Sequence, residues 1–194
     1  ASTSSSANAN RRSFRKPRWF TSGAFCLLSI IEKNLQNKPN MSQGSSIKVS
    51  VVGASGYSGE ELVHRLLNHP CAALTAITSR QFAGKRLSET FPRFTRQGLA
   101  DTLKFTEPDP SILAQTAEIV FLALPHGAAA EYTQELLEND IRVIDLSADF
   151  RLSDPAVYEE FYGDKHPAPN LMKEAVYGLP ELYRKEIHAA KLIA

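Results

Sequence analysis

The fold of this chain is decided by the stretch Val49-Ser50-Val51-Val52-Gly53-Ala54-Ser55-Gly56-Tyr57-Ser58-Gly59-Glu60-Glu61-Leu62-Val63. A β-branched run ends in three glycines spaced three residues apart, and a segment with apolar residues at helical spacing follows. This order predicts a strand, a tight turn and the start of a helix. A βα unit that binds a dinucleotide has the same order, so the stretch predicts a cofactor site at the turn.

Each of the three glycines has a separate expected role. Gly53 lets the chain turn sharply off the strand, and Gly56 has no Cβ to keep a pyrophosphate away from the backbone. Gly59 lets the new helix pack closely on the sheet. The N-terminus of that helix then offers unpaired N–H groups and the positive end of its dipole to an anion.

The side chains between the glycines add to this candidate site. Ser55 and Ser58 are placed to supply hydroxyl donors to a phosphate, and Tyr57 is placed to cover it. The alternative is a tight turn in which the serines cap the helix and no ligand binds.

Strand and helix patterns alternate along the rest of the chain. The expected strands are 47–52, 73–79, 103–106, 119–124, 142–146 and the start of one at 191–194, and the expected helices are 59–68, 109–115 and 128–139. Residues 81–101 are expected to form a polar loop with one short helix, and the chain after Asp149 is expected to be irregular. Because residues 119–124 are apolar throughout, they predict a strand buried on both faces. The fold class is therefore α/β, a doubly wound parallel sheet of the Rossmann type with right-handed crossovers.

The charge is distributed unevenly. Residues 1–46 contain seven Lys/Arg and one acid, whereas residues 47–194 contain fifteen Lys/Arg and twenty acids. A globular part with excess negative charge is not typical of a nucleic-acid-binding protein, so no nucleic acid is expected as a partner. The apolar patch at residues 20–31 is too short and interrupted for a membrane span, so no membrane partner is expected either.

Residues 1–46 differ in composition from the rest. They are rich in Ser and Arg and poor in acids, which is typical of a transit peptide for a plastid or mitochondrion. A disordered or non-native extension is favoured instead, because the chain does not begin with Met and Met41 stands just before the first strand. The expected organisation is this extension followed by one NAD(P)-binding domain over residues 47–194, with a cytoplasmic location.

The two cysteines give no sign of a metal site. Cys26 and Cys71 fall in segments of different character without metal-ligand spacing, and such sparse cysteine usage indicates a reducing compartment. No metal is expected, and Cys71 is expected to be a small, partly buried apolar residue.

The end of the second strand predicts which dinucleotide binds. In a dinucleotide fold this position faces the adenosine ribose, where an acid favours NAD and Arg or Ser favours the 2′-phosphate of NADP. No acid occurs between Ala73 and Arg86, and Ser79, Arg80 and Lys85 follow the strand. NADP is therefore the expected cofactor, with Ser79 and Arg80 as its candidate ligands; the alternative is a solvated basic loop.

The turn after residues 119–124 is expected to border the nicotinamide half of the cofactor. Ligands of open α/β sheets bind outside the carboxyl ends of the strands, so Leu124 and Pro125 are candidate contacts. His126 follows them, and a structural hydrogen bond is favoured for it over acid–base catalysis.

Two further segments contain polar or turn residues near strand ends. Ser147, Asp149 and Arg151 are expected either to touch an anionic substrate or to order the site, and a structural ion pair between Asp149 and Arg151 or a neighbour is the alternative. Residues 177–182 are interpreted as a structural turn.

Taken together, these segments resemble the N-terminal part of the N-acetyl-γ-glutamyl-phosphate reductase family, within the aspartate-semialdehyde-dehydrogenase-like group. The resemblance covers residues 47–194, and its motifs are specific in combination. They are Gly53–Gly59, Thr78–Arg80, Phe121–Gly127, Asp145–Leu152 and Ala175–Leu182. The spacing Gly-x-x-Gly-x-x-Gly is the usual form in this family.

The resemblance implies a reaction and a limit. The family reduces an acyl phosphate, N-acetyl-glutamyl 5-phosphate, to N-acetyl-glutamate 5-semialdehyde with NADPH in arginine biosynthesis, through a cysteine thioester. The nucleophile belongs to an Asn-Pro-Gly-Cys motif that in the family follows a segment like residues 191–194. No catalytic residue is therefore expected within the 194 residues. The chain is expected to be a fragment that ends before the catalytic and dimerisation domain of a homo-oligomeric enzyme, and to be inactive alone.

Two other functions remain open from the sequence. One is an N-acetyl-aminoadipyl-phosphate reductase of lysine biosynthesis, whose substrate is one methylene longer. The other is a stand-alone dinucleotide-binding module without catalysis.

Overall fold

The structure, a computed structural model, describes residues 46–194. The expectations for the preceding extension, and for Cys26 within it, lie outside the described residues. The strands are β1 (Ile47–Val52), β2 (Ala72–Thr78), β3 (Phe105–Thr106), β4 (Ile119–Leu122), β5 (Arg142–Asp145) and β6 (Leu192–Ile193). The α-helices are α2 (Tyr57–Leu67), α3 (Leu87–Thr90), α4 (Pro110–Thr116), α5 (Ala130–Glu138), α6 (Pro155–Tyr162) and α7 (Pro180–Ala189).

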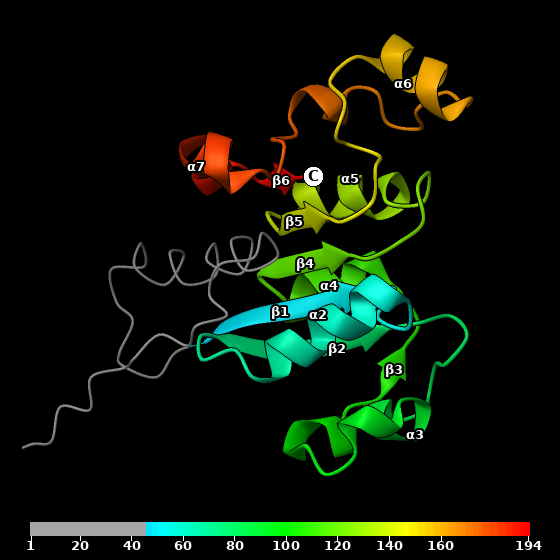
Figure 1. Cartoon of the computed structure of the whole chain (residues 1–194), viewed down its shortest axis with the longest axis vertical. Helices are drawn as coiled ribbons and strands as arrows, with labels where there is room; N and C mark the ends of the chain where they lie inside the picture. Colours follow the sequence, from blue (N-terminus) through cyan, green and yellow to red (C-terminus); the bar gives the residue numbers. More distant parts are fainter. Residues whose placement is uncertain (1–45) are drawn as a thin grey trace, which may run out of the picture.

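The strands form one parallel sheet in the order β3-β2-β1-β4-β5-β6, which Figure 1 shows from bottom to top. The chain starts in the centre, builds outward to β3, returns past β1 to β4 and builds outward again to β6. This is the strand order of a doubly wound dinucleotide-binding fold, so the predicted fold class is confirmed. The strand at β1 spans the predicted residues, and the others differ from prediction only at their ends.

Alternate residues of the central strands face two separate cores, as the twofold repeat of a strand requires. Val51 and Phe121 lie in the core under α2, whereas Val52 and Leu122 lie in the core under α4 and α5. Helices therefore cover both faces of the sheet, which explains why β4 is apolar throughout.

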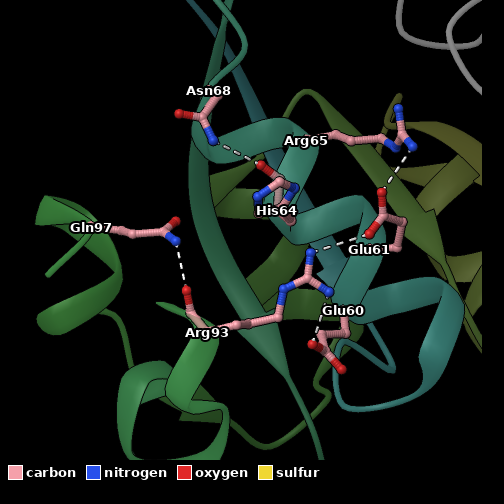
Figure 2. Close-up of polar contacts among 7 residues, drawn as sticks. All are labelled: Glu60, Glu61, His64, Arg65, Asn68, Arg93 and Gln97. Atoms are coloured by element: carbon pink, nitrogen blue, oxygen red, sulfur yellow. Dashed lines mark hydrogen bonds and ion pairs between the residues drawn. The ribbon is translucent and has the colours of Figure 1, made fainter. Parts of the chain in front are cut away.

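The connection after β2 is more ordered than a polar loop. It contains α3 and two 3₁₀ turns, η1 (Pro92–Phe94) and η2 (Gly98–Asp101). Arg93 ties it to α2, because its guanidinium donates to Glu60 at 3.2 Å and to Glu61 at 3.3 Å (Figure 2). Although burial acts to raise the pKa of Glu61, hydrogen bonds and charge from Arg93 and Arg65 hold that pKa below its usual value.

The expectation of an irregular chain after Asp149 is wrong, because α6 and α7 lie there. Each helix buries few apolar side chains: Tyr158 is the buried residue of α6, and Pro180 and Ile187 are those of α7. The helical period of apolar residues is therefore weak in both helices. The ends of α6 are nevertheless marked in the sequence. Asp154 accepts from the amide of Ala156 at 2.8 Å, Pro155 opens the first turn, and Gly163 in the left-handed conformation ends the helix.

The segment interpreted as a structural turn supports the edge of the sheet. The amide of Val176 donates to Leu192 at 3.0 Å, and the amide of Gly178 donates to Ala194 at 2.5 Å. These bonds extend the parallel pairing beyond β6. None of the helices in the part of the chain that the structure describes has the length and apolar composition that a membrane span requires.

Candidate cofactor site

A cavity of about 420 Å³ opens at the carboxyl ends of β1, β2 and β4, against the first turn of α5. Seven of the ten predicted cofactor residues line it: Gly53, Ser55, Gly56, Ser79, Arg80, Leu124 and Pro125. The other three, Tyr57, Ser58 and Gly59, form the first turn of α2 beside it. The topology thus brings together three sequence segments that were separately proposed to bind one cofactor.

The three glycines differ in what surrounds them. A Cβ at Gly53, whose φ is +76°, would lie 2.3 Å from the Ala123 carbonyl oxygen, and a Cβ at Gly59 would lie 2.4 Å from the Gly53 carbonyl oxygen. Both glycines are therefore required by packing of the turn against β4 and α2. A Cβ at Gly56 would meet only the Gly53 oxygen, at 3.6 Å. Its backbone is open to a ligand, as a pyrophosphate requires.

The N-terminus of α2 offers free donors. Its N-cap is Gly56, which has no side chain, and no side chain within residues 46–194 accepts from the amides of Tyr57, Ser58 or Gly59. The alternative with helix-capping serines is thus not what the structure contains. Orphan amides and the helix dipole at this end favour an anion. The Tyr57 ring is 98% exposed beside them.

Ser79 joins the glycine turn to the end of β2. Its side chain is buried, its hydroxyl lies 2.8 Å from the Ser55 hydroxyl, and it accepts from the amide of Phe82 at 3.3 Å. Two neighbouring hydroxyls therefore line the floor of the cavity between the two segments.

Arg80 reaches across the cavity to α5. Its guanidinium donates to the Tyr132 hydroxyl at 2.9 Å and to the Glu131 carboxylate at 3.5 Å. Tyr132 and Glu131 together raise the pKa of Arg80, and burial raises the pKa of Tyr132. Sequence reasoning missed both partners, because it searched for an acid only beside β2, whereas α5 is fifty residues further along the chain.

Asp149 orders the loop that carries Leu124 and Pro125. Its fully buried carboxylate accepts from the amides of Gly127 at 2.6 Å and Ala129 at 3.0 Å. The expected ion pair with Arg151 is not formed in the described chain, where the Arg151 guanidinium donates instead to the Leu146 carbonyl at 3.0 Å. The helix α5 begins at Ala130 and not at residue 128 as predicted.

Neighbouring polar groups complete this edge of the sheet. Ser147 donates its amide at 2.9 Å and its hydroxyl at 2.7 Å to the buried Asp145 carboxylate, and accepts from the Asp149 amide at 3.1 Å. Burial raises the pKa of Asp145 to about 6.

His126 is exposed, with its ring centroid 5.8 Å from that of Tyr162. Cys71 is partly buried at the other end of the sheet, where its carbonyl accepts from the Ile47 amide.

The position of the cavity defines the class of protein. It lies where the strand order reverses between β1 and β4, outside the carboxyl ends of the strands, which is where ligands of open α/β sheets bind. A glycine turn with open backbone and an uncapped helix start lies at its edge. These are the features of a Rossmann-type dinucleotide-binding domain.

A comparison with known proteins gives the family. The sequence profile described as "Semialdehyde dehydrogenase, NAD binding domain" matches residues 48–190, and the chain belongs to that family. The resemblance inferred from the motifs is thereby confirmed, as is a nicotinamide dinucleotide as the cofactor class.

Individual relatives point the same way. The chain is 57% identical over 149 residues to an N-acetyl-gamma-glutamyl-phosphate reductase of Akkermansia muciniphila, a match that covers 76% of the chain and 43% of the relative. It is 47% identical over 148 residues to a LysW-L-2-aminoadipate/LysW-L-glutamate phosphate reductase of Sulfurisphaera tokodaii, covering 76% of the chain and 42% of the relative. The chain thus spans less than half the length of these relatives.

A solved structure shares the fold. Aspartate semialdehyde dehydrogenase II of Vibrio cholerae, complexed with ASA, superposes with a TM-score of 0.52 at 18% identity, covering 77% of this chain and 41% of that one.

Proposed function

We propose that this chain is the NADP-binding part of an N-acetyl-γ-glutamyl-phosphate reductase, an oxidoreductase of arginine biosynthesis. The observation that carries the proposal is the 57% identity over 149 residues to the Akkermansia muciniphila protein of that name. The reaction is the NADPH-dependent reduction of N-acetyl-glutamyl 5-phosphate, a small acyl phosphate, to the semialdehyde. The whole enzyme is proposed to be a homo-oligomer.

The phosphates of the cofactor are assigned to the start of α2. The pyrophosphate lies against Gly56 and the free amides of the first turn, with the hydroxyls of Ser55 and Ser58 as further donors and Tyr57 as a cover. Gly53 and Gly59 act through the shape of the turn, because neighbouring backbone atoms already occupy the space that a Cβ at either position would need.

The two ends of the cofactor are assigned to the other cavity walls. Ser79 and Arg80 take the 2′-phosphate of the adenosine ribose, and Leu124 and Pro125 border the nicotinamide. When bound, the cofactor supplies a hydride. Asp149 contributes indirectly: by accepting from the amides of Gly127 and Ala129 it fixes the loop that carries Leu124 and Pro125.

Cofactor titration tests this assignment. The unchanged chain is expected to bind NADPH more tightly than NADH. Arg80→Ala is expected to weaken NADPH binding about tenfold and to leave NADH binding unchanged, because a charge-assisted hydrogen bond to the 2′-phosphate is lost. Lys85→Ala is the matched control, since Lys85 is also basic and near β2 but contacts the Phe82 ring outside the cavity. Equal affinities of the unchanged chain for the two cofactors would contradict the assignment.

The second candidate is the corresponding lysine-pathway reductase, because two relatives at 47% identity are named LysW-L-2-aminoadipate/LysW-L-glutamate phosphate reductase, one of them putatively. Chimeras separate the two. Residues 47–194 would replace the matched region of the Akkermansia or the Sulfurisphaera relative, each assayed on its own substrate. Activity in the first chimera and its loss in the second supports the arginine-pathway function, and the reverse result supports the alternative.

We infer a cytoplasmic location from the bacterial relatives, with a plastid or mitochondrion as the alternative if residues 1–46 act as a transit peptide. A fusion of these residues to a fluorescent protein tests this, and import into an organelle would contradict the cytoplasmic location.

A further inference from the structure

We propose that Glu131 competes with the cofactor's 2′-phosphate for the guanidinium of Arg80, and that Tyr132 holds this guanidinium at the cavity. The pair would thus set how strongly the site prefers NADPH over NADH. The inference rests on the assignment of Arg80 to the 2′-phosphate made above, and it concerns two residues of α5 to which no role was given there.

The charges around the cavity are few. Arg80 and Glu131 are the only charged side chains among the described residues that line it. They lie 3.5 Å apart, with Arg80 69% and Glu131 63% exposed. An exposed pair at this distance is weak and screened by salt, so a phosphate can displace the carboxylate from the guanidinium.

The carboxylate disfavours the phosphorylated cofactor in two ways. It occupies the guanidinium before the cofactor arrives, and a phosphate monoester that carries close to two negative charges is repelled by it. NADH has no 2′-phosphate, so neither effect acts on it. Specificity is a difference between two affinities, and Glu131 changes only one of them.

Tyr132 differs from Glu131 in that it brings no charge to the site at neutral pH. Its ring is 3% exposed and packs in the core under α5, so its hydroxyl is fixed in place. The hydroxyl accepts from the same Arg80 nitrogen at 2.9 Å. Holding the long side chain of Arg80 in this way reduces the rotamer entropy that it loses when the phosphate binds.

The experiment measures NADPH and NADH dissociation constants of the 194-residue chain by titration at low and high salt. Glu131→Gln is expected to tighten NADPH about threefold at low salt, less at 0.5 M salt, and to leave NADH unchanged. Glu135→Gln is the matched control, because it removes the same charge from an exposed position one turn further along α5 and away from the cavity. Tyr132→Phe keeps the ring and is expected to weaken NADPH about threefold without affecting NADH.

The double variant Arg80→Ala/Glu131→Gln separates competition from direct repulsion. If Glu131 acts through Arg80, the gain from Glu131→Gln shrinks in the Arg80→Ala background. A gain of equal size in both backgrounds overturns the competition, and so does an equal effect of Glu131→Gln and Glu135→Gln. If Arg80→Ala leaves the NADPH preference intact, the assignment of the 2′-phosphate fails together with this inference. If Arg80→Ala erases the preference while Glu131→Gln behaves like its control, only this inference fails.

Discussion

Asp149→Asn tests the most buried charged group near the cavity. The carboxylate of Asp149 accepts from two backbone amides through its two oxygens, and it is fully buried. An asparagine of the same size keeps one acceptor and directs its NH₂ group at the other amide, which leaves two donors facing each other. Losing a hydrogen bond to a charged acceptor costs about 2–3 kcal/mol, which lowers the melting temperature of a domain of this size by about 5–10 °C.

The assay is thermal and urea unfolding followed by circular dichroism, together with NADPH titration below the transition. NADPH affinity is expected to fall several-fold, because the loop with Leu124 and Pro125 loses its anchor. Asp154→Asn is the matched control: Asp154 caps α6 through the Ala156 amide at the surface, and Asn is an equally good N-cap. If Asp149→Asn costs no more stability than Asp154→Asn, the anchoring role is refuted.

Two further predictions concern the glycine turn and a buried acid. Gly56→Ala is expected to fold normally and to bind NADPH poorly. Gly59→Ala is expected to lower the free energy of unfolding by about 2 kcal/mol or more, because only a Cβ at Gly59 meets backbone atoms closer than 3 Å. Thermal melts and NADPH titration check both variants. Burial raises the pKa of Asp145 from 3.8 to about 6, so the folded state keeps a proton that the unfolded state releases, and this contribution to stability is lost as the pH rises from about 4 to 6. Asp145→Asn cannot ionise, so its unfolding free energy is expected to rise by about 3 kcal/mol relative to the unchanged chain between pH 4 and 7, measured in urea; a constant difference over this range would count against the raised pKa.

The sequence predicted those parts of the fold whose signals are local. Residues 47–52 form β1 as expected, because a β-branched run bounded by a glycine turn leaves few alternatives. By contrast, α6 and α7 were missed, since each buries only one or two of its residues and its apolar period is correspondingly weak. The caps that define α6 are the signal that would have revealed it.

The candidate site shows the same division between local signals, which the sequence contains, and tertiary contacts, which it does not reveal. The glycine turn, the end of β2 and the turn after β4 were each found from their own residues, and the parallel sheet places all three at one edge because their strands run in the same direction. The sequence identified Asp149 as a candidate but did not decide whether it forms an ion pair or orders the site. Its role depends on which backbone amides lie within hydrogen-bonding distance of its buried carboxylate, and tertiary packing determines this.

Cofactor preference shows why the local rule at the end of β2 is incomplete. The rule considers the residues that follow the strand, where Arg80 is basic and no acid is present. In the folded chain Arg80 meets an acid all the same, because α5 packs beside α4 and β5 and places Glu131 3.5 Å from the guanidinium. The charge around the Arg80 guanidinium, where we propose that the 2′-phosphate binds, therefore comes from two segments separated by about fifty residues. On this proposal, the residues after β2 predict the direction of the preference for NADPH over NADH, because Arg80 is basic. The size of that preference also depends on Glu131 of α5, so Glu131→Gln is the informative variant.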